Sequence, residues 1–191
     1  MKRLAIFVSG NGTNMENLLR CVRDKEIPAE VSFIVSDNPA AYALKRAEQF
    51  KVECVAVEPK KFPSKEAFEA EVRRHLERKK IDYILLAGFM RILSPAFVRA
   101  YPKRILNLHP ALLPKFPGAH AIREAWEAKE KVTGVTVHFV DEGVDTGPVI
   151  LQREVKIDPN ETLESLEAKV HAVEYELYPE AINLVLSGKK R

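Results

Sequence analysis

Residues 4–14 read LAIFVSGNGTN, and this stretch decides which fold the sequence predicts. Leu4–Val8 is a short, continuous apolar run, which is typical of a strand buried on both faces of a parallel sheet. The glycine-rich turn leads into a helical pattern that runs through Val22, with Thr13 or Asn14 as the expected N-cap. A strand, a glycine-rich turn and a helix N-terminus favour a bound phosphate, because backbone amides and the helix dipole point at it. We therefore expect an α/β sheet with a phosphate site at this turn.

A dinucleotide is the alternative ligand for such a turn. Asp37, which follows the second expected strand, offers a ligand for the ribose. However, Met15 stands where the dinucleotide fingerprint requires its third glycine. The sequence therefore favours a monophosphate over a dinucleotide.

The rest of the chain continues to alternate strand patterns with helix patterns. Strands are expected at 31–36, 52–57, 82–88, 104–108, 134–140 and 149–155. Helices are expected at 40–50, at 64–79, from 94–95 onward, after His120 through Trp126, and at 161–186. The helix over 64–79 is expected to expose a charged face composed of Glu69, Glu71, Arg73, Arg74, Glu77 and Arg78. The alternation predicts a right-handed, doubly wound parallel sheet. Ligands of such sheets bind beyond the carboxyl ends of the strands, so we expect residues 9–14, 89–93 and 107–109 to converge.

Asn107 and His109 end a strand pattern within residues 105–118, which read ILNLHPALLPKFPG. The prolines keep the following backbone from continuing as a helix or as a paired strand. Because Asn107 and His109 are two residues apart, an extended backbone points both side chains to the same face. An amide and an imidazole on one face can hold a carbonyl oxygen as it becomes an oxyanion. The alternative is that the two side chains only cap the strand end and hydrogen-bond the proline-containing loop.

A second polar cluster, DEGVDTGP at residues 141–148, follows the alternating strand pattern of residues 134–140. A carboxylate such as Asp145, if it lies beside His109, would favour the imidazolium and keep it available as a donor and an acid. The sequence therefore indicates Asn107, His109 and Asp145 as a candidate catalytic group.

Four motifs resemble those of the folate-dependent formyltransferases: SGNGTN at 9–14, NLHPALLP at 107–114, GVTVHFV at 134–140 and DTGP at 145–148. The resemblance extends from Leu4 to about Leu184, and the first motif is similar to that of the members that formylate 5′-phosphoribosylglycinamide. It implies a Rossmann-like, doubly wound, mostly parallel α/β sheet with helices on both faces. It also implies one formyltransferase domain over residues 1–188, followed by a basic tail at residues 189–191.

The activity that the resemblance implies is transfer of a formyl group from 10-formyltetrahydrofolate, as co-substrate, to the amine of phosphoribosylglycinamide through a tetrahedral intermediate. A formyltetrahydrofolate hydrolase, or another folate-dependent formyltransferase, is the alternative within the family. A non-catalytic nucleotide-binding module is the alternative from another class, and it would leave Asn107, His109 and Asp145 without a role.

The resemblance also assigns roles to residues. The catalytic residues it implies are Asn107, His109 and Asp145. The residues it implies for binding phosphoribosylglycinamide are Gly12, Thr13, Asn14, His171 and Glu174. The residues it implies for binding folate are Lys65, Met90, Arg91, Ile92, Leu93, Asn107, Asp141 and Val144. Lys65 stands where relatives carry an arginine near the folate tail, which keeps the charge but loses the bidentate fork. For Arg91 a structural ion pair is the alternative, for Glu174 a solvated helix face, and the roles of His120 and His138 are left open.

The composition agrees with an enzyme that acts on small molecules. The chain has 191 residues, of which 46% are hydrophobic and 30% charged, as in ordinary globular proteins. The last three residues, Lys189, Lys190 and Arg191, supply the whole formal charge of +3, so no nucleic acid is expected as a partner. No apolar run reaches the roughly 20 residues that span a bilayer, and no His or Cys spacing is typical of a metal site. We expect a cytoplasmic monomer or homodimer that uses no metal and has no membrane partner.

Overall fold

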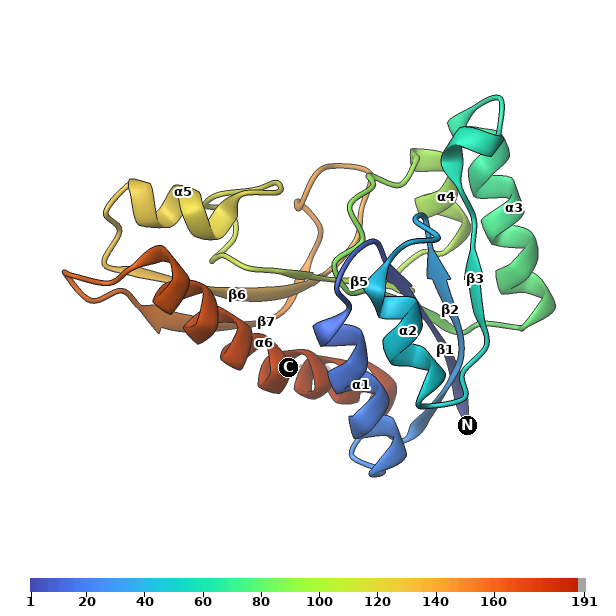
Figure 1. Ribbon diagram of the computed structural model, residues 1–191, viewed down its shortest axis with the longest axis horizontal. Coiled ribbons are helices and arrows are strands. Elements are labelled where there is room, and N and C mark those ends of the chain that lie inside the picture. The colour runs from blue at the N-terminus through green and yellow to red at the C-terminus, as the bar shows by residue number, and fades with distance from the viewer. Residues whose placement is uncertain (189–191) are drawn as a thin grey trace. The chain divides into compact units, whose positions relative to one another are not determined.

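The computed structural model describes residues 1–188, which form two compact units, Met1–Leu106 and the residues from Asn107 onward. The first unit contains β1 (Lys2–Val8), α1 (Thr13–Arg23), β2 (Ala29–Ser36), α2 (Tyr42–Glu48), β3 (Cys54–Ala56), the 3-10 helix η1 (Pro59–Lys61), α3 (Lys65–Arg78), β4 (Tyr83–Leu86) and α4 (Pro95–Ala100) (Figure 1). Strand β5 (Ile105–His109) begins in the first unit and ends in the second, which also contains α5 (Ala121–Glu127), β6 (Val132–Phe139), β7 (Val149–Lys156) and α6 (Leu163–Ser187). The expected single domain over 1–188 stays a prediction, and the expected tail, 189–191, lies outside the described residues.

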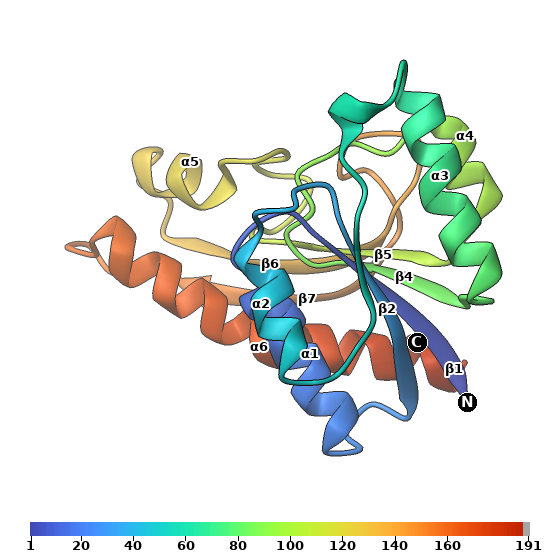
Figure 2. The same cartoon turned by 45° about the vertical axis from the view of Figure 1, so that its right-hand side comes forward.

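The first unit is a parallel sheet in the order β3-β2-β1-β4. Helices α1 and α2 cover one face of these strands, and α3 and α4 cover the other (Figures 1 and 2). On the second of these faces, the Phe7 ring of β1 packs edge-on against Phe97 of α4, with centroids 6.4 Å apart, and the Phe33 ring of β2 stacks on His75 of α3. All of Leu4–Val8 is buried, because helices cover both faces of β1. The expected alternation and the continuous apolar run are thus confirmed.

The strand order reverses between β1 and β4, since the chain proceeds outward to β3 and then returns to the other side of β1. The carboxyl ends of β1 and β4 are therefore neighbours, which is where ligands of such sheets bind. The amide of Ser9 donates to the carbonyl of Gly88 at 3.2 Å, and the amide of Met90 donates to Oγ of Ser9 at 2.9 Å. The glycine-rich loop and the segment 88–90 thus lie side by side, as the topology predicted.

The residues at which the helices over 64–79 and from 94–95 onward were expected to start cap α3 and α4, whereas the expected cap of α1 is wrong. Ser64 accepts a hydrogen bond from the amide of Ala67, and Ser94, with Pro95 after it, caps α4 in the same way. Neither Thr13 nor Asn14 is the N-cap of α1, because the helix already begins at Thr13. The N-cap is Gly12, which has a left-handed backbone and no side chain to make a capping bond. A helix start without a side-chain cap leaves its first amides to other acceptors.

The expectation that Glu69 lies on the exposed face of α3 is wrong. Glu69 is only 4% exposed, and its carboxylate accepts hydrogen bonds from both the amide and the hydroxyl of Ser94. The amide of an N-cap residue needs an acceptor when it is buried, and Glu69 supplies one. This pair joins α3 to the start of α4.

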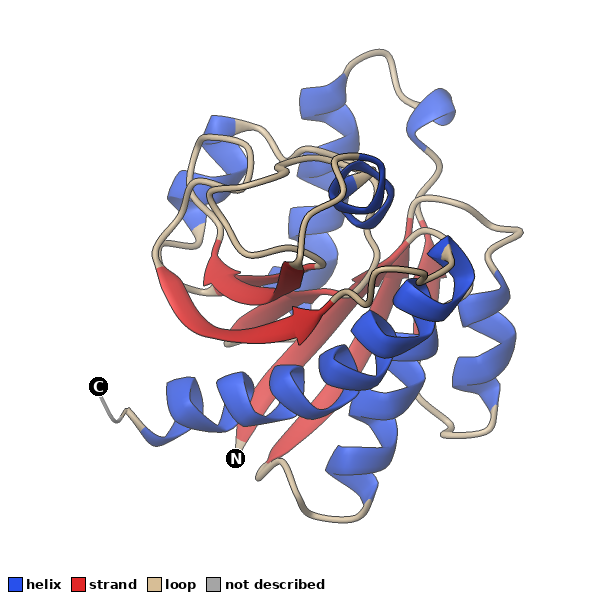
Figure 3. Cartoon of the chain, turned by 90° about the vertical axis from the view of Figure 1, so that its left-hand side faces the viewer, coloured by secondary structure: helices blue, strands red, loops and turns tan. Residues whose placement is uncertain are grey.

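The second unit is built around the antiparallel hairpin β6–β7, in which Thr136 pairs with Gln152. The long helix α6 packs against both strands, and in Figure 3 it is the long helix that leads to the marked C-terminus. Helix α5 packs against α6, and Nε1 of Trp126 donates to the carbonyl of Glu161, just before α6, at 2.8 Å. Within residues 1–188 we find no helix with both the length and the apolar character needed to cross a bilayer.

Candidate active site

Asn107 and His109 lie at the end of β5 beside Asp145, which comes from the loop between β6 and β7. Oδ2 of Asp145 lies 3.5 Å from Nδ1 of His109, and Oδ1 accepts a hydrogen bond from Nδ2 of Asn107 at 3.4 Å. His109 is only 3% exposed, so water screens this interaction weakly. The three residues that the sequence indicated as a catalytic group therefore form one cluster.

The hydrogen bonds of His109 define which of its atoms carry hydrogen. Nε2 lies 2.7 Å from the carbonyl oxygen of Phe116, and because a carbonyl can only accept, Nε2 is the donor. Nδ1 then faces the carboxylate of Asp145. This arrangement suits an imidazolium, in which both ring nitrogens donate.

His138 is a fourth member of the cluster, which the sequence left open. It is 2% exposed, and its Nδ1 donates to the carbonyl of Phe139 at 2.9 Å. Its Nε2 lies 3.2 Å from Nδ2 of Asn107 and 3.6 Å from Oδ1 of Asp145. Nε2 of His138 therefore faces both the amide of Asn107 and the carboxylate of Asp145. The alternation of β6, which puts His138 on the same face as Thr136, was the available signal.

Asp145 is held as a carboxylate. Burial by itself raises its pKa, but hydrogen bonding by His138, the amide of Gly118 at 2.9 Å and the nearby His109 outweigh that effect, so the pKa lies below its usual range. A group that stays ionised in a partly buried place can orient an imidazolium and stabilise it.

The loop that carries Asp145 is fixed at both ends. Oδ1 of Asp141 accepts from the amide of Gly143 at 3.0 Å and from the hydroxyl of Thr146 at 2.7 Å. Gly147 passes so close to β6 that a Cβ atom there would lie 1.8 Å from the carbonyl oxygen of Phe139. Asp141 thus shapes the loop, while Val144 is exposed at its tip.

The proline-containing loop after His109 is anchored to the hairpin by Thr136 of β6 and Gln152 of β7, which are paired across the two strands. The hydroxyl of Thr136 accepts from the amide of Leu113 at 3.2 Å and donates to the carbonyl of Ala111 at 2.6 Å. Gln152, which pairs with Thr136, donates to the carbonyl of Leu113 at 2.9 Å. The strand end that bears His109 is therefore supported by β6 and β7.

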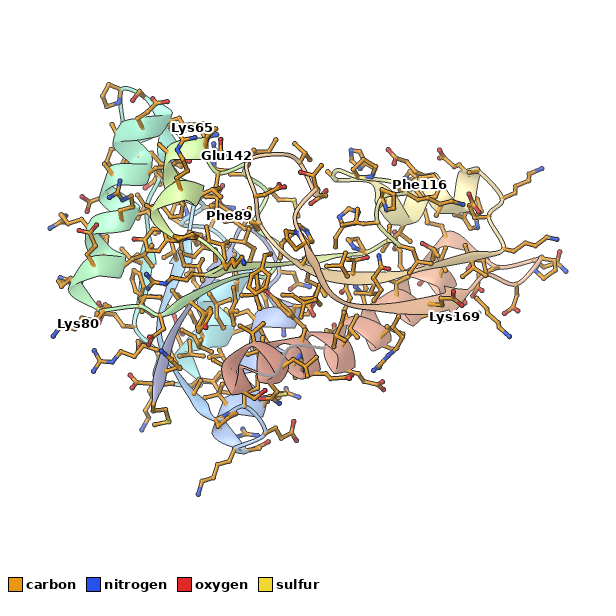
Figure 4. The ribbon with its side chains drawn as sticks, turned by 180° about the vertical axis from the view of Figure 1, so that it is seen from behind. Lys65, Lys80, Phe89, Phe116, Glu142 and Lys169 are labelled. Atoms are coloured by element: carbon orange, nitrogen blue, oxygen red, sulfur yellow. The ribbon has the colours of Figure 1, made fainter. Side chains whose placement is uncertain are left out.

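Five of the predicted folate-binding residues surround a cavity of about 690 Å³ in the first unit. They are Lys65, Met90, Arg91, Ile92 and Leu93. Met90 and Ile92 are exposed apolar side chains, and the rings of Phe62 and Phe68 add further apolar wall. Lys65 lies at the start of α3, and Figure 4 shows it at the opposite end of that helix from Lys80. Apolar walls with a few charged groups, at this volume, suit a flat heteroaromatic ligand.

Arg91, for which a structural ion pair was the alternative to folate binding, does form such a pair. Its Nε donates to Oδ2 of Asp37 at 2.7 Å. Asp37, the residue that a dinucleotide would need for its ribose, is thus engaged by a side chain of the chain itself. The Arg91 side chain as a whole remains 45% exposed and lines the cavity, so the ion pair does not remove it from the cavity wall.

The predicted substrate-binding residues fall in two places. Gly12, Thr13 and Asn14 form the start of α1 in the first unit, and His171 and Glu174 form a pair on α6 in the second. Nδ1 of His171 lies 2.8 Å from Oε2 of Glu174, which is 4% exposed, so the solvated helix face is the wrong alternative for Glu174. Donation of a hydrogen bond to the Glu174 carboxylate raises the pKa of His171 against the opposing effect of burial. The convergence of Asn107 and His109 with residues 9–14 stays a prediction.

Two remaining expectations concern histidines and metal. His120, whose role the sequence left open, occupies the N-cap position of α5 and makes no capping bond with its side chain. In the described part of the chain, no three His, Cys, Asp or Glu side chains gather in a way that could hold a metal ion.

The family of the chain follows from comparison with known proteins. The model of a family described as Formyl transferase matches residues 2–182, so this chain belongs to the formyl transferase family, as its motifs predicted. The chain is 41% identical to phosphoribosylglycinamide formyltransferase of Bacillus subtilis (strain 168) over 191 residues, which cover 100% of this chain and 98% of that protein. The crystal structure of glycinamide ribonucleotide transformylase 1 from Geobacillus kaustophilus is similar with a TM-score of 0.95 at 48% identity, over 97% of this chain and 99% of that one.

A third relative is much longer. Trifunctional purine biosynthetic protein adenosine-3 of Drosophila melanogaster is 43% identical over 189 residues, which cover 98% of this chain but only 14% of that protein. Together with the parallel sheet of the first unit, the structural similarity confirms the expected Rossmann-like α/β fold.

Proposed function

We propose that this chain transfers the formyl group of 10-formyltetrahydrofolate to the primary amine of 5′-phosphoribosylglycinamide, a step of purine biosynthesis. Relatives that carry the name of this activity align along almost their entire length. The single observation of the structure that carries the proposal is the cluster formed by the buried His109 with the partly buried Asn107 and Asp145. This cluster joins two hydrogen-bond donors to a carboxylate, as acyl transfer through an oxyanion requires.

The reaction forms one bond and breaks another. The amine nitrogen attacks the formyl carbon, the carbonyl electron pair moves onto oxygen, and the tetrahedral intermediate collapses with loss of the folate nitrogen. The amine gives up a proton and the folate nitrogen takes one. Asn107 and His109 stabilise the oxyanion, each by about 3 kcal/mol. Asp145 orients His109 and assists the proton transfer.

The hydrogen bonds that these donors make within the chain favour an oxyanion over a neutral carbonyl as their partner. His109 Nε2 donates to the Phe116 carbonyl, and the Asn107 amide serves His138 and Asp145. A neutral formyl oxygen is no stronger a hydrogen-bond acceptor for His109 than the Phe116 carbonyl, with which His109 already bonds. An oxyanion is a stronger acceptor, so the exchange becomes favourable only as negative charge develops.

For the co-substrate, we propose that the cavity lined by Lys65 and Met90–Leu93 receives the folate. Met90 and Ile92 would contact the flat rings, while Lys65 and Arg91 supply positive charge for the carboxylates of the tail. Asn107, Asp141 and Val144 complete the proposed folate contacts.

For the nucleotide, we propose that the backbone at Gly12, Thr13 and Asn14 holds the phosphate. The N-terminus of α1 provides amides and a positive dipole end there. His171 and Glu174 are proposed to receive the glycinamide part, since a buried carboxylate suits an amine. We further propose that the enzyme is a cytoplasmic monomer or homodimer with small-molecule substrates, no metal and no nucleic-acid partner.

One assay separates the proposal from its alternatives. The absorbance change on deformylation of 10-formyltetrahydrofolate is followed with and without phosphoribosylglycinamide. The proposal predicts deformylation only when the amine substrate is present. A hydrolase would deformylate without it, and a non-catalytic nucleotide-binding module would deformylate under neither condition.

A further inference from the structure

The glycine-rich loop is held from one side by α2. The amide of Ala43 donates to the carbonyl of Gly10 at 3.0 Å, and Nε of Arg46 donates to the carbonyl of Asn11 at 2.8 Å. Nη2 of Arg46 also donates to the side-chain oxygen of Asn11 at 3.0 Å. Two successive carbonyls of the loop are therefore turned toward α2.

The direction of these carbonyls fixes the direction of the amides that follow them. In a trans peptide the C=O and the next N–H point in opposite directions. Because the carbonyls of Gly10 and Asn11 face α2, the amides of Asn11 and Gly12 face away from it. Gly12 has a φ of 76° and a ψ of 27°, and such left-handed residues occur in backbone concavities that bind anions.

The packing of Gly12 against α2 leaves the glycine-rich loop little room to adopt another conformation. A Cβ atom on Gly12 would lie 2.4 Å from Cβ of Ala43 and 2.8 Å from its Cα. The backbone of the loop thus lies directly against the first turn of α2, and only a glycine fits this position.

Arg46 is itself held in place by its other contacts. Its Nη1 bonds the carboxylate of Glu16 in the first turn of α1, and its guanidinium lies 4.9 Å from the centroid of the Tyr42 ring. Burial raises the pKa of Glu16, but hydrogen bonds from Arg46 and Arg20 outweigh it, so the pKa is lowered and the carboxylate stays charged. With its side chain only 24% exposed, Arg46 forms a rigid link between the loop, α1 and α2.

We infer that Arg46 is a positioning residue for the phosphate of the nucleotide substrate: by holding the Asn11 carbonyl, it aims the Gly12 amide at the phosphate. The inference rests on the proposed function. Arg46 sets the affinity for the phosphate, while the reacting atoms are served by other residues.

The test measures KM for both substrates in Arg46→Ala and Arg46→Lys, with Arg23→Ala as a matched control. Arg23, at the opposite end of α1 from the loop, also bonds a carboxylate, that of Asp24, and lies 5.9 Å from an aromatic ring. Arg46→Ala should raise KM for phosphoribosylglycinamide about tenfold, as expected for one weakened hydrogen bond to a charged group. KM for the folate and kcat should change by less than about twofold.

Arg46→Lys should give a smaller rise in KM, because lysine keeps the charge but lacks the fork that spans both oxygens of Asn11. Arg23→Ala should leave both KM values unchanged. Titration with inorganic phosphate, followed by the NMR shift of the Gly12 amide, should need more phosphate in Arg46→Ala than in the unmodified protein.

Two results would overturn the inference. One is an unchanged KM for the nucleotide in both Arg46 variants together with an unchanged phosphate titration. The other is an equal rise in KM for both substrates, which would make Arg46 a general support of the first unit. Failure of the unmodified protein to formylate phosphoribosylglycinamide would instead contradict the proposed function, so the two failures are distinguishable.

Discussion

Oδ2 of Asp145 lies 3.5 Å from Nδ1 of His109, and the same oxygen accepts a hydrogen bond from the amide of Gly118 at 2.9 Å. One carboxylate oxygen thus ties the loop after β6 to the imidazole and to the end of the proline-containing loop. The other oxygen faces Asn107 and His138. Asp145 is therefore the residue through which the whole cluster is held together.

Replacing Asp145 with asparagine should lower turnover by about two to four decades, because the acid–base partner of His109 is lost while the side-chain size is kept. Substrate KM values and the melting temperature should change little. The matched control is Asp158→Asn, which removes a carboxylate paired with Lys169 at 2.8 Å on the surface (Figure 4). Normal turnover in a badly destabilised Asp145→Asn variant would instead make Asp145 a structural residue.

Glu174→Gln should lower the pKa of His171, which the Glu174 hydrogen bond raises in the unmodified protein. A pKa raised by folding adds stability that is fully present below the unfolded pKa and is lost as pH rises through the folded pKa. The stability difference between the two proteins should therefore shrink over that pH window. NMR titration of His171 and unfolding by urea at several pH values check both expectations.

Glu167→Gln is the control for this experiment, because Glu167 acts on His171 only through its charge and has a weaker effect on the pKa. A His171 pKa that is the same in Glu174→Gln as in the unmodified protein would contradict the account of this pair.

Lys65→Ala should raise KM for the folate about two- to fivefold, the range of a partly exposed ion pair, and leave KM for the nucleotide unchanged. The effect should be larger for folates with more glutamate carboxylates and should fade at high salt. Lys65→Arg should lower KM, because it restores a bidentate fork. Lys80→Ala, at the other end of α3, is the control. Equal KM values in all four proteins would remove Lys65 from the folate site.

The features that sequence predicts well here are those set by neighbouring residues. The continuous apolar run of Leu4–Val8 is buried on both sides, and the spacing of Asn107 and His109 brings them to one cluster. Periodicity and spacing act over a few residues, so no knowledge of the partner segments is needed.

The features that sequence missed depend on partners far along the chain. The helical pattern places Glu69 among charged, solvent-facing residues. In the structure it is buried, and its carboxylate accepts a hydrogen bond from the amide of Ser94. His138 has its role only because Asn107 and Asp145 lie beside it. Likewise, the bracing of the glycine-rich loop comes from Arg46 on the next helix. No local pattern marks such pairs.

The most direct test of the central claim is the single-turnover rate of formyl transfer in Asn107→Asp compared with Asn107→Ala. If Asn107 donates to an oxyanion, alanine should slow the chemical step by about two to three decades, with little change in substrate binding. Asn107→Asp should be at least as slow, because its carboxylate would face the developing negative charge at nearly the same size. An Asn107→Asp variant that transfers formyl at the normal rate and has only lost thermal stability would contradict the catalytic account of this cluster.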